Sequence, residues 1–200
     1  MVYLKTSSYT NAAACLINVL SLNDSTYKPK EEDEYKIWLS SVVLPTRACS
    51  IFGLASVGLN YGLNVKVFTE SLEFDYPDYR FHRYKKSDIE LAKKISELYV
   101  EKSKKEGIEF NVGEVRFEKL KELLVDNYLI VRINTKDIRN LKKNNSNYVV
   151  FLKYEDKMYE IIDPSQGNIS VDEELAKESY VSLETKKHRS HSVLVISKNK

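Results

Sequence analysis

The 200-residue sequence predicts a single α+β domain spanning residues 1–200, with helices early in the chain and antiparallel strands in its last third. Helical apolar periodicity dominates the segments up to residue 63, whereas strand-length apolar runs dominate the segments after residue 127. Strands grouped in this way favour an α+β domain over alternating βαβ units. A hydrophobic content of 42% is sufficient to form the core of such a domain.

The helices are expected from caps and apolar spacing. The first begins near Thr10 or Asn11, and either side chain could cap it by accepting a free backbone N–H. Pro45 should end the second helix, and Gly62 should end the third, which Ser50 could cap. The expected ranges after the first helix are 31–44, 49–63, 87–107 and 117–127.

The strands are expected where apolar residues alternate or run together between turn residues. Residues 147–155 and 157–163 form a hairpin with a polar turn at Glu155 and Asp156. The other expected strands are 64–70, 128–135 and 191–198. The segment from about 71 to 110 is aromatic at first and then strongly charged, so we expect it to be an insertion on the domain.

Charge and composition exclude several partners. The 31 basic and 29 acidic residues leave a net charge of +2, which gives no reason to expect nucleic acid. No apolar run approaches the roughly 20 residues that span a bilayer, and the N-terminus lacks a signal-peptide pattern. With two cysteines, the expectation is a cytoplasmic protein with reduced thiols and no membrane insertion. No glycine-rich nucleotide loop occurs, so no cofactor is expected.

The hairpin sequence "NYVVFLKYEDKMYEIIDPSQG" resembles the second half of peptidase C39-like domains, which have the papain-like cysteine peptidase fold. In that family a His opens the first strand and an Asp-Pro pair closes the second. The resemblance therefore places the general base at Asn147 and the aspartate that orients it at Asp163.

The first helix also resembles this family. On "KTSSYTNAAACLINVL" the position of the catalytic Cys falls on Asn11, and the following Gly position falls on Ala12. The upstream Gln position falls near Lys5 or Thr6, neither of which suits the family pattern. The block "IWLSSVVLPTRACSIFGLASVGLNYGLNVKVF" is similar to a longer branch of these domains. The resemblance implies the papain-like α+β fold.

Two of the three catalytic positions depart from the family. The amides of Asn11 and Asn147 are neither nucleophiles nor bases at neutral pH, and only Asp163 remains. The sequence thus predicts an inactive domain that binds a peptide or protein segment, with Asn11, Asn147 and Asp163 lining the cleft. Degenerate domains of this kind dock substrates for a transporter, which gives the role a precedent.

An active cysteine peptidase or acyltransferase with a relocated nucleophile is the alternative. Cys49 follows Arg47 and precedes a helix start, and both features lower the pKa of a thiol. Cys15 is the other thiol, although its place on an apolar stripe is typical of an inert buried cysteine. His191 or His82 would then act as the base.

Structural explanations compete with these roles. Asn11 is expected mainly to cap its helix, Cys49 to pack under a helix start, and His191 to be exposed at a strand end. His188 and His191 lack the further ligands that a zinc site needs, so no metal site is expected. In a third alternative the protein is structural or regulatory and contacts its partners through residues 71–110.

Overall fold

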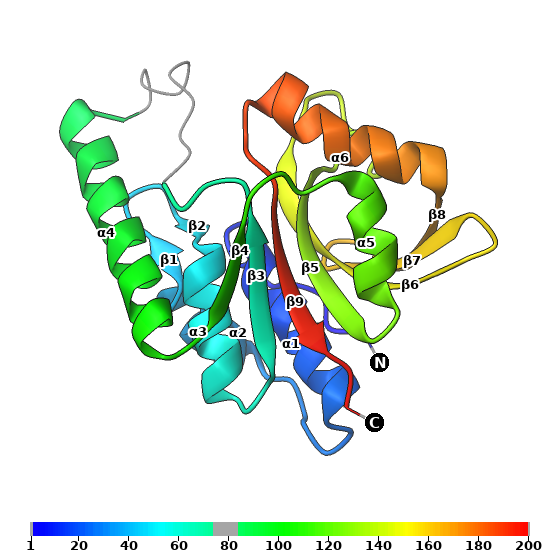
Figure 1. Ribbon diagram of the computed structural model, residues 1–200, viewed down its shortest axis with the longest axis horizontal. Helices are drawn as coiled ribbons and strands as arrows, with labels where there is room; N and C mark the ends of the chain where they lie inside the picture. The colour runs from blue at the N-terminus through cyan, green and yellow to red at the C-terminus, as the bar shows by residue number, and fades with distance from the viewer. Residues whose placement is uncertain (1, 74–83, 200) are drawn as a thin grey trace.

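The computed structural model describes residues 2–73 and 84–199, and six helices lie in this part of the chain (Figure 1). They are α1 (Asn11–Asn23), α2 (Glu31–Leu39), α3 (Ile51–Asn60), α4 (Lys86–Lys105), α5 (Phe117–Leu124) and α6 (Glu173–Lys187). Local signals set several of their ends. Ser50 caps α3 by accepting a hydrogen bond from the backbone N–H of Gly53, and Gly62 after α3 has a φ of 82°.

The strands form one seven-stranded sheet and one short ribbon. The ribbon pairs β1 (Val42–Val43) with β2 (Ala48–Cys49). The large sheet has the order β4-β3-β9-β5-β6-β7-β8. Its strands are β3 (Val65–Thr69), β4 (Glu109–Val112), β5 (Asn127–Asn134), β6 (Ser146–Glu155), β7 (Met158–Asp163), β8 (Gly167–Asp172) and β9 (Ser192–Ser197). All its neighbouring strands are antiparallel except β3 and β4, which confirms the expected α+β class.

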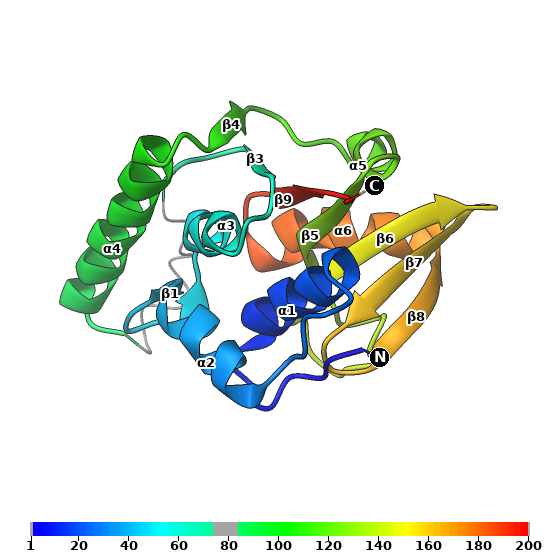
Figure 2. The same ribbon diagram turned by 90° about the horizontal axis from the view of Figure 1, so that it is seen from below.

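Side-chain alternation along the central strands gives each face of the sheet its own core. Ile130, Val150 and Leu194 pack with α1 and α3 in one cluster. Val131, Val149 and Val193, each one position away, pack with α5 and α6 in the other cluster. Figure 2 shows α1 and α3 on one side of the central strands and α5 on the other. The two faces are therefore separate environments, and a side chain's position along a strand decides which face it reaches.

The second expected helix is too long. It ends at Leu39, and Val42 and Val43 form the ribbon strand β1 instead of a last helical turn. The hydroxyl of Ser41 donates to the carbonyl of Ile37, and the carbonyl of Ser41 accepts from the N–H of Ser50. These bonds hold the chain in a turn, and the β-branched valines suit the ribbon that follows.

The strand β8 and the helix α6 lie between residues 164 and 190, where no element is expected from the sequence, and the edge strand β4 is likewise not expected. Asp172 caps α6 by accepting a hydrogen bond from the N–H of Leu175, at 2.9 Å. Ala176, Tyr180 and Leu183 are its buried apolar residues, at helical spacing. This cap and this spacing are sequence signals that could have predicted α6.

The segment 71–110 stays a predicted insertion. Of its described residues, α4 packs against α3, and β4 extends the sheet by pairing in parallel with β3. The hydroxyl groups of Ser56 on α3 and Ser103 on α4 lie 3.0 Å apart in the buried contact. In the described part of the chain, no helix combines the length and apolar character needed to span a bilayer.

Candidate functional site

Asn11 is the first residue of α1 and is 4% exposed. Its Oδ1 accepts a hydrogen bond from the backbone N–H of Tyr148 on β6, at 2.8 Å. The expectation that Asn11 caps its helix is therefore wrong: the N-cap residue is Thr10, whose hydroxyl instead donates to the carbonyl of Ser7. The amide of Asn11 joins the helix to the strand because the unpaired N–H at the start of β6 needs an acceptor.

A cleft of about 440 Å³ opens at the start of α1. The segment before α1, the β2–α3 connection, the start of β6 and residues just before β9 line it. Asn11 and Asn147 are both lining residues, so the structure brings these two predicted positions together. Because both side chains carry neutral amides, they can offer hydrogen bonds to a ligand but no nucleophile or base.

Asp163 ends β7 as expected, but it does not belong to the cleft. It is fully buried, and its carboxylate is paired with Arg139, whose Nε and Nη2 lie 2.6 and 2.8 Å from its two oxygens. The N–H of Ser165 also donates to Oδ1, at 2.8 Å. Among the described residues, those lining the cleft do not include Asp163. The prediction that Asp163 lines the groove is therefore wrong, because the guanidinium of Arg139 holds its carboxylate.

The position of the upstream Gln also has a structural role. The backbone N–H and the hydroxyl of Thr6 donate to Glu34 of α2, which is fully buried. The phenol of Tyr3 donates to the same carboxylate at 2.7 Å, and burial followed by this hydrogen bond raises the pKa of Tyr3. The backbone N–H of Lys5 donates to the carbonyl of Pro164. These bonds fasten the segment before α1 to the fold.

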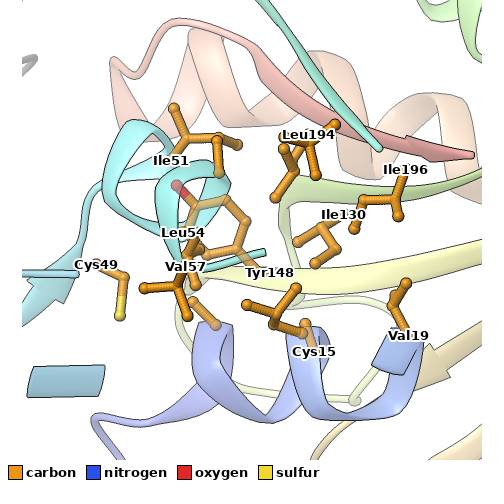
Figure 3. Close-up of a cluster of buried hydrophobic side chains, with 14 of the residues drawn as sticks. Cys15, Val19, Cys49, Ile51, Leu54, Val57, Ile130, Tyr148, Leu194 and Ile196 are labelled. Atoms are coloured by element: carbon orange, nitrogen blue, oxygen red, sulfur yellow. The ribbon is translucent and has the colours of Figure 1, made fainter. Parts of the chain in front are cut away.

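Both thiols lie in the core cluster that α1 and α3 share with the sheet (Figure 3). Cys15 is fully buried, and burial raises the pKa of its thiol well above the ordinary value. Cys49 lines the cleft but is 8% exposed, and burial raises its pKa to about 12. The expectation that Arg47 and the helix start lower the pKa of Cys49 is wrong because burial dominates. Its packing under the start of α3 is confirmed.

His191 is 5% exposed, so the expectation of an exposed histidine is wrong. Its Nδ1 lies 3.0 Å from the carboxylate of Glu70, and its Nε2 lies 3.0 Å from the carbonyl oxygen of Tyr180. The imidazole also stacks on the ring of Tyr180, a member of the α5–α6 cluster. The two thiols belong to the cluster on the opposite face of the sheet. The structure therefore does not bring His191 to either thiol.

Of the remaining histidines, only His188 lies within the described residues, and it does not line the cleft. His82 lies outside the described residues. His188 ends α6 in the left-handed conformation and is exposed. In residues 2–73 and 84–199, no three His, Cys, Asp or Glu side chains are grouped so that they could hold a metal ion.

Arg132 is not among the site residues predicted from the sequence, although it is the one charged residue of strand β5. It pairs across the sheet with Tyr148, and its side chain lies on the cleft side. Nη2 donates to the carbonyl of Ser190 at 3.1 Å, whereas Nε is buried with no hydrogen-bond partner among the described residues. A lone arginine in "YLIVRINT" is the sequence signal that could have identified it, because a charged residue in an apolar strand is rarely buried without a partner.

A family model described as "Peptidase_C39 like family" matches residues 1–195. Among solved structures, the chain is similar to one titled "Crystal structure of a double glycine motif protease from AMS/PCAT transporter in complex with the leader peptide". The TM-score is 0.54 at 14% identity, over 100% of this chain and 91% of that one. This likeness confirms the papain-like fold. No curated protein matches the chain.

Proposed function

The chain belongs to the Peptidase_C39 like family, and from this premise we propose that it is a catalytically inactive member whose cleft binds a peptide or protein segment. The observation that carries the proposal is the pair of amides, Asn11 and Asn147, that line the cleft where the family has its nucleophile and base. An arrangement that retains the cleft without those groups can bind a chain segment but cannot attack its carbonyl.

The aspartate supports the same conclusion. In a working triad, Asp orients an imidazole, whereas here both carboxylate oxygens of Asp163 are bound by Arg139. A carboxylate held in this way stabilises the fold and is not free to orient a base.

A peptide ligand is favoured by the shape and chemistry of the cleft. Its lining combines amide and hydroxyl groups with the ring of Tyr148 and the side chain of Phe52, a mixture that suits a polypeptide backbone and its side chains. The similar protease structure holds a leader peptide, which supports the same class of ligand for this chain.

A relocated nucleophile is the less favoured function. Attack requires a thiolate, and the pKa of about 12 keeps Cys49 protonated at neutral pH. Neither Cys49 nor Cys15 has His191 on its side of the sheet.

A contact role for residues 71–110 has one observation in its favour. Leu91 and Leu98, seven residues apart on α4, are 49% and 69% exposed. Protection of α4 from hydrogen exchange by a partner, without protection near Asn147, would support this third function.

Affinity selection from a synthetic random peptide library of fixed length tests the leading proposal. The wild-type protein should enrich peptides and return them uncleaved. Ser8 is exposed and lines the cleft, so Ser8→Trp should fill it and abolish enrichment. The matched control Ser170→Trp, on the edge strand β8, should enrich as the wild type does.

Two results would contradict the proposal. Equal enrichment by the wild type and by Ser8→Trp would show that the peptides bind outside the cleft. Cleavage of library peptides by the wild type, and its loss in Cys49→Ser, would show that the protein is an active enzyme.

A further inference from the structure

The amide nitrogen of Asn11 is a hydrogen-bond donor without a partner. Because Tyr148 N–H donates to Oδ1, the oxygen is fixed toward β6, and the NH₂ group must face the other way. Nδ2 is buried and has no hydrogen-bond partner within the described part of the chain, on a residue that lines the cleft. An oxygen acceptor on a ligand would satisfy this donor and remove the cost of leaving it unpaired.

A second such donor comes from the facing strand. Arg132 is the cross-strand partner of Tyr148, and its Cζ lies 6.0 Å from the centre of the Tyr148 ring. The backbone N–H of Tyr148 holds Asn11, so Asn11 and Arg132 flank the same residue. Nε of Arg132 is buried and unpartnered among the described residues, although Nη2 donates to Ser190. A guanidinium commonly binds a carboxylate through two parallel N–H groups.

The surrounding charge favours an anion. Among the described residues that line the cleft, Arg47, Arg132 and Arg189 are basic and Glu73 is acidic. The start of α1 also faces this space without a side-chain cap, because the hydroxyl of Thr10 donates elsewhere. The positive end of the helix dipole adds to the attraction.

Resting on the proposed function, we propose that this cleft recognises a carboxylate of its peptide ligand, bound between the Asn11 amide and the Arg132 guanidinium. A carboxylate presents two oxygens in one plane, which matches one planar NH₂ donor and one planar guanidinium. The carboxylate is either the C-terminus of the peptide or the side chain of an Asp or Glu residue, and the two sources share this chemistry.

Short synthetic probes test the proposal on the full chain. Acetyl-Ala-Ala offers a terminal carboxylate, acetyl-Ala-Glu-amide offers a side-chain carboxylate, and acetyl-Ala-Ala-amide offers none. Binding is measured by NMR titration. At least one carboxylate probe should bind about tenfold or more tightly than the amide, because charge-assisted hydrogen bonds are lost in the amide. The better of the two carboxylate probes identifies the source.

Two variants locate the site. Arg132→Met removes the guanidinium and keeps much of the side-chain length, so it should weaken the carboxylate probe about tenfold or more. Asn11→Asp keeps an acceptor for Tyr148 but replaces the donor by a negative charge, so it should abolish binding. The control Arg116→Met changes an exposed arginine outside this cleft and should bind as the wild type does. If Asn11→Asp fails to fold, Arg132→Met alone carries the test.

Equal binding of the acid and amide probes, or unchanged binding by folded Arg132→Met, would overturn the proposal. The failure of the proposed function can be distinguished from the failure of this inference. If library peptides bind in the cleft regardless of their carboxylates, peptide binding stands and this inference fails. If acetyl-Ala-Ala binds but no library peptide does, the carboxylate site stands and the binding of a longer peptide segment in the cleft fails.

Discussion

Two polar sites at one end of the β6–β7 hairpin are built in opposite ways. At Asp163, where β7 ends, both carboxylate oxygens are bound by Arg139, and both side chains are removed from solvent, at 0% and 8% exposure. Beside the start of β6, Asn11 and Arg132 each keep a buried donor with no partner among the described residues. We call the first the closed pair and the second the open pair.

The difference separates an ion pair whose groups are bonded within the fold from a pair of donors that could bind a ligand. The closed pair leaves no group for a ligand, and it ties the loop that carries Arg139 to the end of β7. The open pair is incomplete by itself, and it lines the cleft. Of the three positions that a catalytic triad would use together, Asp163 is held in an ion pair, whereas Asn11 and Asn147 line the cleft.

The largest expected effect is on the alkylation rates of the two thiols. A reactive thiol at the cleft would contradict the comparison, because the open pair would then lie beside a nucleophile. With a pKa of about 12 for Cys49 and a still more strongly buried Cys15, both thiols stay protonated below about pH 9. Alkylation of the native protein should therefore be about a thousandfold slower than that of the unfolded chain near pH 8.5. Mass spectrometry across about pH 5 to 9 measures these rates. Fast reaction of Cys49 near pH 6, slowed by His191→Gln, would contradict the inactive-domain proposal.

The closed pair should dominate stability. Arg139→Met leaves the buried charge of Asp163 unpaired and should lower the free energy of unfolding by about 3–5 kcal/mol in urea titrations. The control Lys153→Met breaks an exposed pair with Glu155 and should cost about 0–1 kcal/mol. Similar losses for the two variants would show that the closed pair has no special structural role.

The open pair should contribute less. Asn11→Ala leaves the N–H of Tyr148 without its acceptor and should cost about 1–3 kcal/mol, measured in the same urea titrations. The loss stays below that of Arg139→Met because no charge is left unpaired. Asn168→Ala, an exposed asparagine on β8, is the matched control and should change stability by no more than about 0.5 kcal/mol. A larger loss for Asn11→Ala than for Arg139→Met would reverse the comparison.

Local patterns predicted much of the fold because the signals lie within a few residues of each other. Ser50 and Gly62 mark the two ends of α3. The strands of the β6–β7 hairpin follow their apolar runs closely. The errors occur where a distant contact decides the structure. Val42 and Val43 leave the helix because Ala48 and Cys49 supply a strand partner, and β4 forms because β3 is available beside it.

The sequence by itself determined that no thiol stands at the start of α1 and no imidazole at the start of β6, since residue identity alone fixes which groups can attack or accept a proton. The tertiary structure decided how the remaining groups are used. Arg139 is 24 residues from Asp163, and Tyr148 is 137 residues from Asn11. Burial likewise reversed the expected effect on the Cys49 thiol and placed His191 on the other face of the sheet. Residues so distant in the chain come into contact only when the helices pack against the sheet. The same packing excludes solvent from them.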